Sequence, residues 1–291
     1  METLIKYLEC NWGIQADTTA TILLTVSIFL LGILATEIIK FVSRLQNRIT
    51  SRQVFNAFIN GVIKQISIQE KAYYKTSLQF TFESERDFVV SRATIAEIDN
   101  RGLDYVSIYS AYFKGLENLT IRKKKKLLKI KAFNKLWESL DTITYWHKRS
   151  FDDMEFFRSK YESYNDSRNE SLDEHRRLIE KVSTTFDGKK LDRPFGEYIQ
   201  NIDKITVNWQ AEPDRTRPDK VQRKLVVPIR ILNRRNSKIA LARLSSDILL
   251  LTSMHYENMY NLLNLYKFQY FDYGRIFKNS QRLLNKCLKI L

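Results

Sequence analysis

The sequence predicts an all-α protein with a single membrane-spanning helix near its N-terminus. Glycine and proline are scarce, at 8 and 4 of 291 residues, and so few breakers favour long helices over a many-turned β-sandwich. Apolar residues recur every three or four positions over most of the chain, which is the period of an amphipathic helix. One uncharged apolar run, residues 18–36, is long enough to cross a bilayer.

The apolar run is expected to be an uncleaved anchor. Its 19 residues would span roughly 28 Å as a helix, close to the ~30 Å hydrocarbon core. The alternatives are a buried helix of a soluble protein and a signal peptide. A signal peptide would need a basic start and a small-residue cleavage site, and residues 1–17 and the end of the run supply neither.

The charges that flank the run predict its orientation. Lys40, Arg44, Arg48 and Arg52 follow it, whereas only Lys6 precedes it. The positive-inside rule therefore places residues 1–17 outside and the remainder in the cytoplasm, with the protein in the inner (cytoplasmic) membrane.

The cytoplasmic part is predicted to be helical from residue 37 to residue 208. Its first apolar stripe, residues 54–66, continues the pattern of the span, so one long helix is expected to leave the membrane. Residues 100–102 (Asn-Arg-Gly) predict a break. The polar stretch 150–175 is compatible with either a solvated helix or a loop.

A linker is predicted at residues 209–228, because three of the four prolines lie there. Leu225 to Pro228 are expected to form a short strand within it. A C-terminal helical region then covers residues 229–291.

Composition limits the chemistry. Two cysteines exclude a disulfide scaffold, and three widely separated histidines do not form a metal-ligand set. Phosphate-binding glycine loops, the nucleophile elbow and HExxH are all missing from the sequence. We therefore expect no cofactor and no metal, whereas the net charge of +15 favours an anionic partner.

Basic side chains cluster in two places. Residues 122–135 hold eight basic residues and no acidic one, and Leu127, Leu128, Ile130 and Phe133 are expected to pack beneath this basic face. The face could lie on anionic lipid, bind phosphates of nucleic acid, or simply be solvated. The basic-patch residues are Arg122, Lys123, Lys124, Lys125, Lys126, Lys129, Lys131, Arg234 and Arg235.

One candidate catalytic pair is present. Arg168 and His175 fit the loose Arg-x(4–6)-His spacing of ribonucleases with the HEPN fold, in which His handles the 2′-hydroxyl proton and Arg binds phosphate. Acidic neighbours, including Asp173 and Glu174, would repel RNA. The alternative is a charged surface segment without catalysis.

Two segments resemble the bacterial phage abortive infection membrane-protein family. Residues 243–251 (Arg-Leu-Ser-Ser-Asp-Ile-Leu-Leu-Leu) are similar to a stretch near the C-terminus of that family, which has an Arg, then Leu-Ser, then leucines. Residues 101–105 (Arg-Gly-Leu-Asp-Tyr) resemble its Gly-Arg-x-x-Phe segment with the first two residues reversed, and residues 227–232 match its aromatic segment poorly. The family commonly has two membrane helices, and here there is one. The resemblance carries no catalytic residues and implies antiviral defence at the membrane.

Two function classes follow, and a third option is a scaffold with no role in defence. The first is a membrane-anchored antiphage effector or sensor that acts by oligomerisation and partner binding, with anionic lipid as a further contact. The second is a membrane-tethered ribonuclease using Arg168 and His175, for which nucleic acid would be the partner.

Overall fold

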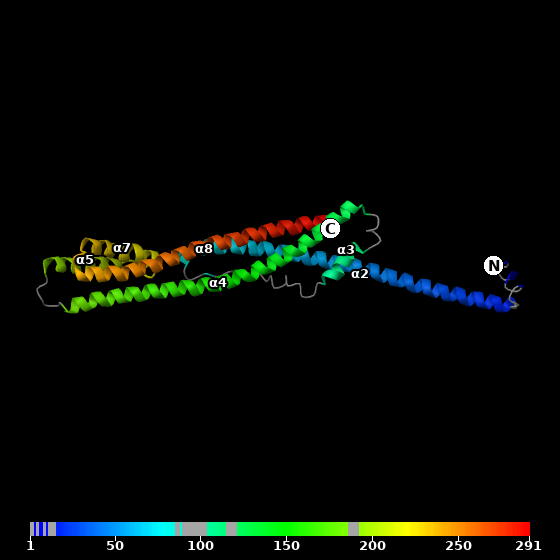
Figure 1. The fold of residues 1–291 in the computed structure, drawn as a ribbon, viewed down its shortest axis with the longest axis horizontal. Coiled ribbons are helices and arrows are strands. Elements are labelled where there is room, and N and C mark those ends of the chain that lie inside the picture. The colour runs from blue at the N-terminus through cyan, green and yellow to red at the C-terminus, as the bar shows by residue number, and fades with distance from the viewer. Residues whose placement is uncertain are drawn as a thin grey trace. The chain divides into compact units, whose positions relative to one another are not determined.

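The computed structural model describes residues 3, 6–7, 10, 16–84, 88, 104–114, 121–185 and 192–291. Every regular element in these ranges is a helix, which confirms the predicted all-α class (Figure 1). The break expected at residues 100–102 lies outside them, as does most of the external segment 1–17. The elements are α2 (Ala16–Gln79), η1 (Phe82–Ser84), α3 (Tyr105–Phe113), α4 (Lys123–Thr185), α5 (Arg193–Gln210), α6 (Pro218–Val221), the π-helical η4 (Gln222–Val226), α7 (Val227–Arg235) and α8 (Ala240–Ile290).

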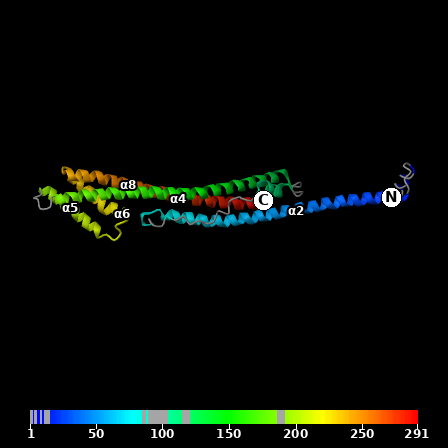
Figure 2. The same cartoon turned by 90° about the horizontal axis from the view of Figure 1, so that it is seen from below.

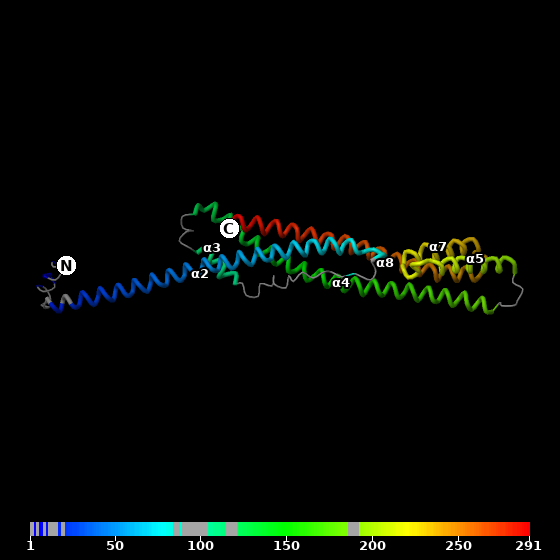
Figure 3. The backbone as a smooth tube through the Cα atoms, turned by 180° about the vertical axis from the view of Figure 1, so that it is seen from behind, coloured from blue at the N-terminus to red at the C-terminus, as the bar shows by residue number. Residues whose placement is uncertain are grey.

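Helix α2 holds the apolar run and continues beyond it without interruption, as the sequence predicts (Figure 3). The most apolar 18-residue window of α2 has a mean hydropathy of 2.5, and none of it is buried. The hydroxyls of Thr21, Thr25 and Thr36 each donate to the carbonyl four residues earlier at 2.8 Å. Because these polar groups are satisfied within the helix, they need no water. The start of α2 is therefore long and apolar enough to cross a membrane.

The chain divides into two compact units. The first unit comprises Met1–Gly61, Asn100–Asn134 and Cys287–Leu291, and the second comprises Val62–Asp99 and Lys135–Lys286. The long helices α2, α4 and α8 each contribute to both units.

The core of the first unit is aromatic. Phe55 of α2 is fully buried, with its ring centroid 6.1 Å from that of Tyr112 in α3 and 6.2 Å from that of Phe133 in α4. Arg52 Nε donates to the carbonyl of Ala111 at 2.7 Å, and its guanidinium lies 5.4 Å from the centre of the Tyr112 ring. These contacts fix α2 to α3 within this unit.

A second aromatic core fills the second unit. Phe157 of α4 is fully buried, and its ring centroid lies 4.9 Å from those of Phe80 and Phe88 and 5.0 Å from that of Tyr266 in α8. The sequence of residues 150–175 is compatible with either a helix or a loop. The structure places these residues within α4, where they contribute the buried ring of Phe157.

Several polar side chains of the second core, those of Tyr73, Tyr273 and Asp153, have partners within it. The hydroxyl of Tyr73 lies 2.7 Å from Ser150 Oγ, and Tyr273 donates to the Asp153 carboxylate. Arg149 Nε also lies 3.1 Å from Asp153 Oδ1. Burial of this carboxylate is therefore offset by hydrogen bonds and by one ion pair.

Residues 209–228, the predicted linker, hold the end of α5, a turn, α6 and η4. Pro194 and Pro218 occupy the first turns of α5 and α6, where the missing N–H leaves no helical bond unmade. Pro228 instead follows the π-helical η4 directly, within continuous helical backbone. The short strand expected at Leu225 to Pro228 is wrong, because this segment is helical. Val226 and Ile229 are buried against Leu249 of α8, so tertiary packing overrides the local preference of a Val-Val-Pro sequence for extended backbone.

Helix α5 and the segment from α6 to α7 pack on α4 and α8 within the second unit (Figure 2). Tyr198 and Ile202 of α5 are buried with Leu241 of α8, and Ile179 of α4 packs against them. This packing positions the walls of the cavity described next.

Candidate functional site: a cavity between α4 and α5

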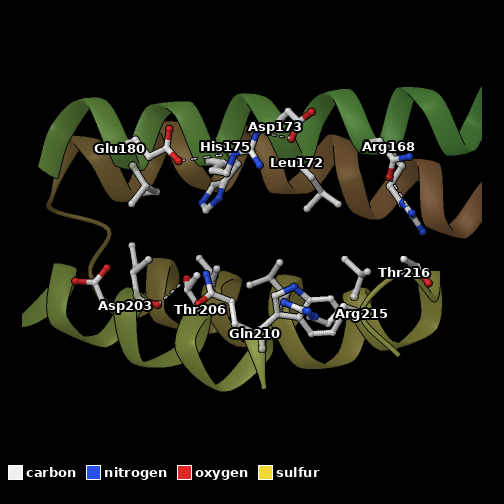
Figure 4. A pocket seen from close by; sticks show the side chains of 18 of the residues that line it. Arg168, Leu172, Asp173, His175, Glu180, Asp203, Thr206, Gln210, Arg215 and Thr216 are labelled. Carbon is white, nitrogen blue, oxygen red and sulfur yellow. Dashed lines mark hydrogen bonds and ion pairs between the residues drawn. The ribbon is translucent and has the colours of Figure 1, made fainter. Parts of the chain in front are cut away.

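The second unit contains a cavity of 1010 Å³. One wall is the α4 segment from Asn165 to Thr184, and the facing wall is formed by α5, the turn that follows it, α6, η4 and α7 (Figure 4). Its volume is at the upper end of the range of small-molecule sites, about 300–1,000 Å³.

Arg168 and His175 both line this cavity. They lie seven residues apart on α4, which is close to two helical turns and about 10 Å along the axis, so both project from the same face. Figure 4 shows both side chains directed toward α5. Arg168 is 4% exposed and His175 is 7% exposed, so the alternative of a charged surface segment is wrong for both residues.

His175 belongs to a buried hydrogen-bonded network that joins four helices. Its Nε2 lies 2.8 Å from Ser245 Oγ in α8, and the amide of Asn233 in α7 is 2.8 Å from the same oxygen. The Asn233 amide also lies 2.8 Å from the hydroxyl of Tyr198 in α5.

The orientation of the Asn233 amide fixes the tautomer of His175. When Nδ2 of Asn233 donates to Tyr198 and to the carbonyl of Ile229, its Oδ1 accepts from Ser245 Oγ and from the N–H of Ser246, so all its groups are paired. Ser245 then accepts from His175 Nε2–H, because its single proton is already donated. The Nδ1 atom is left as the acceptor of the ring.

Burial also fixes the charge of His175. It lowers the pKa of the imidazole from 6.5 to about 4, so the ring is neutral at neutral pH. Burial likewise raises the pKa of Tyr198 to about 12. The network is therefore an uncharged one, and a histidine with so low a pKa is poorly suited to exchange protons near pH 7.

Acidification is expected to destabilise the protein through His175. Between pH 6.5 and pH 4 the unfolded chain binds a proton that the folded chain excludes, so stability falls as the pH falls. From pH 7 to pH 5 the expected loss is about 2 kcal/mol. Thermal unfolding of the detergent-solubilised protein, followed by circular dichroism, measures it. His175→Gln keeps an N–H near Ser245 but cannot titrate, so this variant should lose much less stability between pH 7 and pH 5. Equal losses in the two proteins would show that His175 is not the residue responsible.

The mouth of the cavity carries paired charges. Arg176 lies 3.2 Å from Asp173 and 3.8 Å from Glu180, and all three side chains are more than half exposed. Among charged residues that line the cavity, Arg168 is the buried one.

The basic-patch residues lie in both units. Arg122 to Lys125 and Lys131 are exposed around the start of α4, and Lys126 and Lys129 are half-buried, with Lys129 Nζ donating to the carbonyl of Leu291 at 2.7 Å. Arg234 and Arg235 are exposed in the last turn of α7, in the second unit.

The expected packing beneath the first basic run is only partly correct. Phe133 is fully buried and Ile130 is half-buried, but Leu127 and Leu128 are 53% and 55% exposed. Two exposed leucines therefore lie among the lysines, because this first part of α4 has packing partners on only one side.

Sequence reasoning found Arg168 and His175 but missed their partners. Ser245 lies 70 residues from His175, and Asn233 lies 12 residues from Ser245. Neither has a sequence signal, although Ser245 falls in the segment 243–251 that carries the family resemblance. Among the described residues, no group of three His, Cys, Asp or Glu side chains could hold a metal ion.

Comparison with known proteins adds no assignment to this geometry: no family model, no curated protein and no solved structure matches the chain.

Proposed function

We propose that the chain is a single-pass inner-membrane protein whose helical module serves as an antiphage effector or sensor in the cytoplasm. The observation that carries the membrane part is the start of α2, where apolar side chains such as Leu24 and Leu31 are 63% and 64% exposed. Exposure of so much apolar surface to water would be unfavourable, whereas the hydrocarbon of a bilayer would cover it.

The orientation rests on charge. Lys40, Arg44 and Arg48 directly follow the apolar run and favour the cytoplasmic side for the rest of the chain. The role in phage defence rests on the resemblance of residues 243–251 to a segment of the phage abortive infection membrane-protein family.

Self-association is part of the proposal, because one span cannot enclose a pore. Exposed apolar residues of α8 support it. Leu244, Leu251 and Met254 are 56%, 48% and 50% exposed, and Leu265 and Phe268 are 59% and 68% exposed. Successive members are 7, 3, 11 and 3 residues apart, so all five fall on the a and d positions of one heptad register, whose remaining positions hold Asp247, Asn258 and Asn261. A second copy of α8 is the proposed cover for these apolar side chains.

The ribonuclease alternative has weaker support. Arg168 and His175 do line one cavity, but His175 is neutral and its Nε2 is committed to Ser245. General acid–base catalysis needs a group that changes its protonation near the working pH. The geometry favours binding over catalysis.

Two measurements test the proposed function. A reporter fused after Leu291 should be active only in its cytoplasmic form, and periplasmic activity would overturn the orientation. Cells that carry the full chain should show fewer phage plaques than cells that carry a variant without residues 18–36. A matched variant with an unrelated apolar span of the same length keeps the anchor and should protect as the wild type does. Equal plaque numbers with and without the anchor would reject the defence role.

A further inference from the structure

The cavity in the second unit has a cationic end. Arg168 projects into it from α4, and Figure 4 places Arg215 and Thr216 of the turn after α5 at the same end. Glu180 and Asp203 lie at the opposite end. Two of the three arginines that line the cavity therefore lie at this end, whereas the third, Arg176, is paired with Asp173 and Glu180.

Arg168 is suited to bind an oxyanion. Its guanidinium stays charged at every physiological pH and carries five N–H donors in a planar fork. Nη2 donates to the neutral Oδ1 of Asn169 at 2.9 Å. A hydrogen bond from the same guanidinium to a carboxylate or phosphate would be stronger, because both partners are charged. The side chain is 4% exposed, so an anion there would be largely shielded from water, where charge-assisted hydrogen bonds are strongest.

The wall next to this end is apolar. Leu172 of α4, Trp209 of α5 and Leu225 of η4 each pack against the buried cluster that contains Val226 and Ile229, and all three line the cavity. An indole and two leucines suit the flat or apolar body of a small molecule. Thr206 and Gln210 of α5 also line the cavity, and the Thr206 hydroxyl donates to the carbonyl of Ile202.

We propose that this cavity binds a small organic anion, with its carboxylate or phosphate on Arg168 and its apolar body against Leu172, Trp209 and Leu225. The site goes beyond the membrane role proposed above and does not depend on it. Because His175 is neutral, it contributes a hydrogen-bond acceptor and no charge.

Isothermal titration of the full chain in phosphatidylcholine nanodiscs tests the proposal, with empty nanodiscs as the blank. The probes are 1-naphthoate and 1-naphthyl phosphate, each compared with an uncharged counterpart, 1-naphthamide and 1-naphthol. At least one anion should bind saturably and at least about 10-fold more tightly than its counterpart, since charge-assisted hydrogen bonds discriminate by that much. The tighter of the two anions identifies the group that the site prefers.

Three variants assign the site. Arg168→Gln should weaken binding of the preferred anion on the order of 10- to 100-fold and abolish its advantage over the uncharged probe. Thr206→Trp, which fills the cavity from α5 and leaves Arg168 in place, should abolish binding of both. Arg176→Gln, at the mouth, should stay within about twofold of the wild type, because its charge is already paired with Asp173 and Glu180.

Circular dichroism establishes whether the Arg168→Gln protein is folded. If it is not, loss of probe binding in the Thr206→Trp protein is the result that tests the site. Equal affinity for charged and uncharged probes, undiminished binding by Thr206→Trp, or no saturable heat from any probe overturns the proposal.

Discussion

Replacing Phe157 with alanine is expected to lower the free energy of unfolding by about 3–5 kcal/mol, the usual cost of removing a buried aromatic ring. Phe157 is fully buried, with four aromatic neighbours within 6 Å in the second unit. Their rings cannot all move to fill the space, so a cavity would remain. Thermal or urea unfolding of the solubilised protein, followed by circular dichroism, measures the loss.

The adjacent residue provides the control. Phe156 is 55% exposed, and its ring lies 5.7 Å from Lys160 Nζ. Phe156→Ala removes the same atoms and should cost less than about 1 kcal/mol. Equal losses for the two variants would show that the aromatic core of α4 is not packed as described.

Neutralising the lysines at the start of α4 should weaken membrane binding on the order of 100-fold. Each basic residue near an anionic surface contributes about 1 kcal/mol, and three of the four lysines from Lys123 to Lys126 are exposed. Exposed Leu127 and Leu128 would add apolar contact with lipid. The measurement is flotation of residues 42–291, which lack the anchor, with vesicles that contain anionic lipid, after Lys→Gln substitution of all four. Binding of the unsubstituted segment should also fade with salt.

A variant with the same loss of charge is the control for this experiment. Arg177, Lys181, Arg193 and Lys204 are exposed in the second unit, and their replacement by Gln should leave flotation much less affected. If the Lys123–Lys126 variant floats as well as the unsubstituted segment while RNA binding falls, the basic run serves nucleic acid, and the ribonuclease alternative gains support.

The sequence predicts those parts of the fold that depend on the local spacing of apolar residues. The course of α2 through and beyond residues 18–36 follows from an apolar pattern and uninterrupted helical spacing, and both are local. The strand expected at Leu225 to Pro228 was wrong because those apolar residues satisfy a contact with Leu249, which no local pattern reveals. Leu127 and Leu128 show the converse, since apolar character alone does not supply a packing partner.

The candidate site was only half visible for the same reason. Arg168 and His175 share a helix, so their spacing on one face could be calculated. The facing wall, with Trp209 and Arg215, is brought to them by the packing of α5 on α4 and α8, which spacing does not encode. The burial that lowers the pKa of His175 is a property of the assembled helices, so the charge state of this residue could not be predicted from the sequence.

The network of Tyr198, Asn233, Ser245 and His175 has an evolutionary consequence. Each member satisfies a buried polar atom of another, so a substitution at one position leaves its neighbour without a partner inside the protein, at about 1–3 kcal/mol. Substitution of both partners in a pair by apolar groups of similar shape avoids that penalty. These four positions should therefore be inherited as a set in descendants of this chain: kept together, or exchanged together for an apolar combination, with few intermediates surviving.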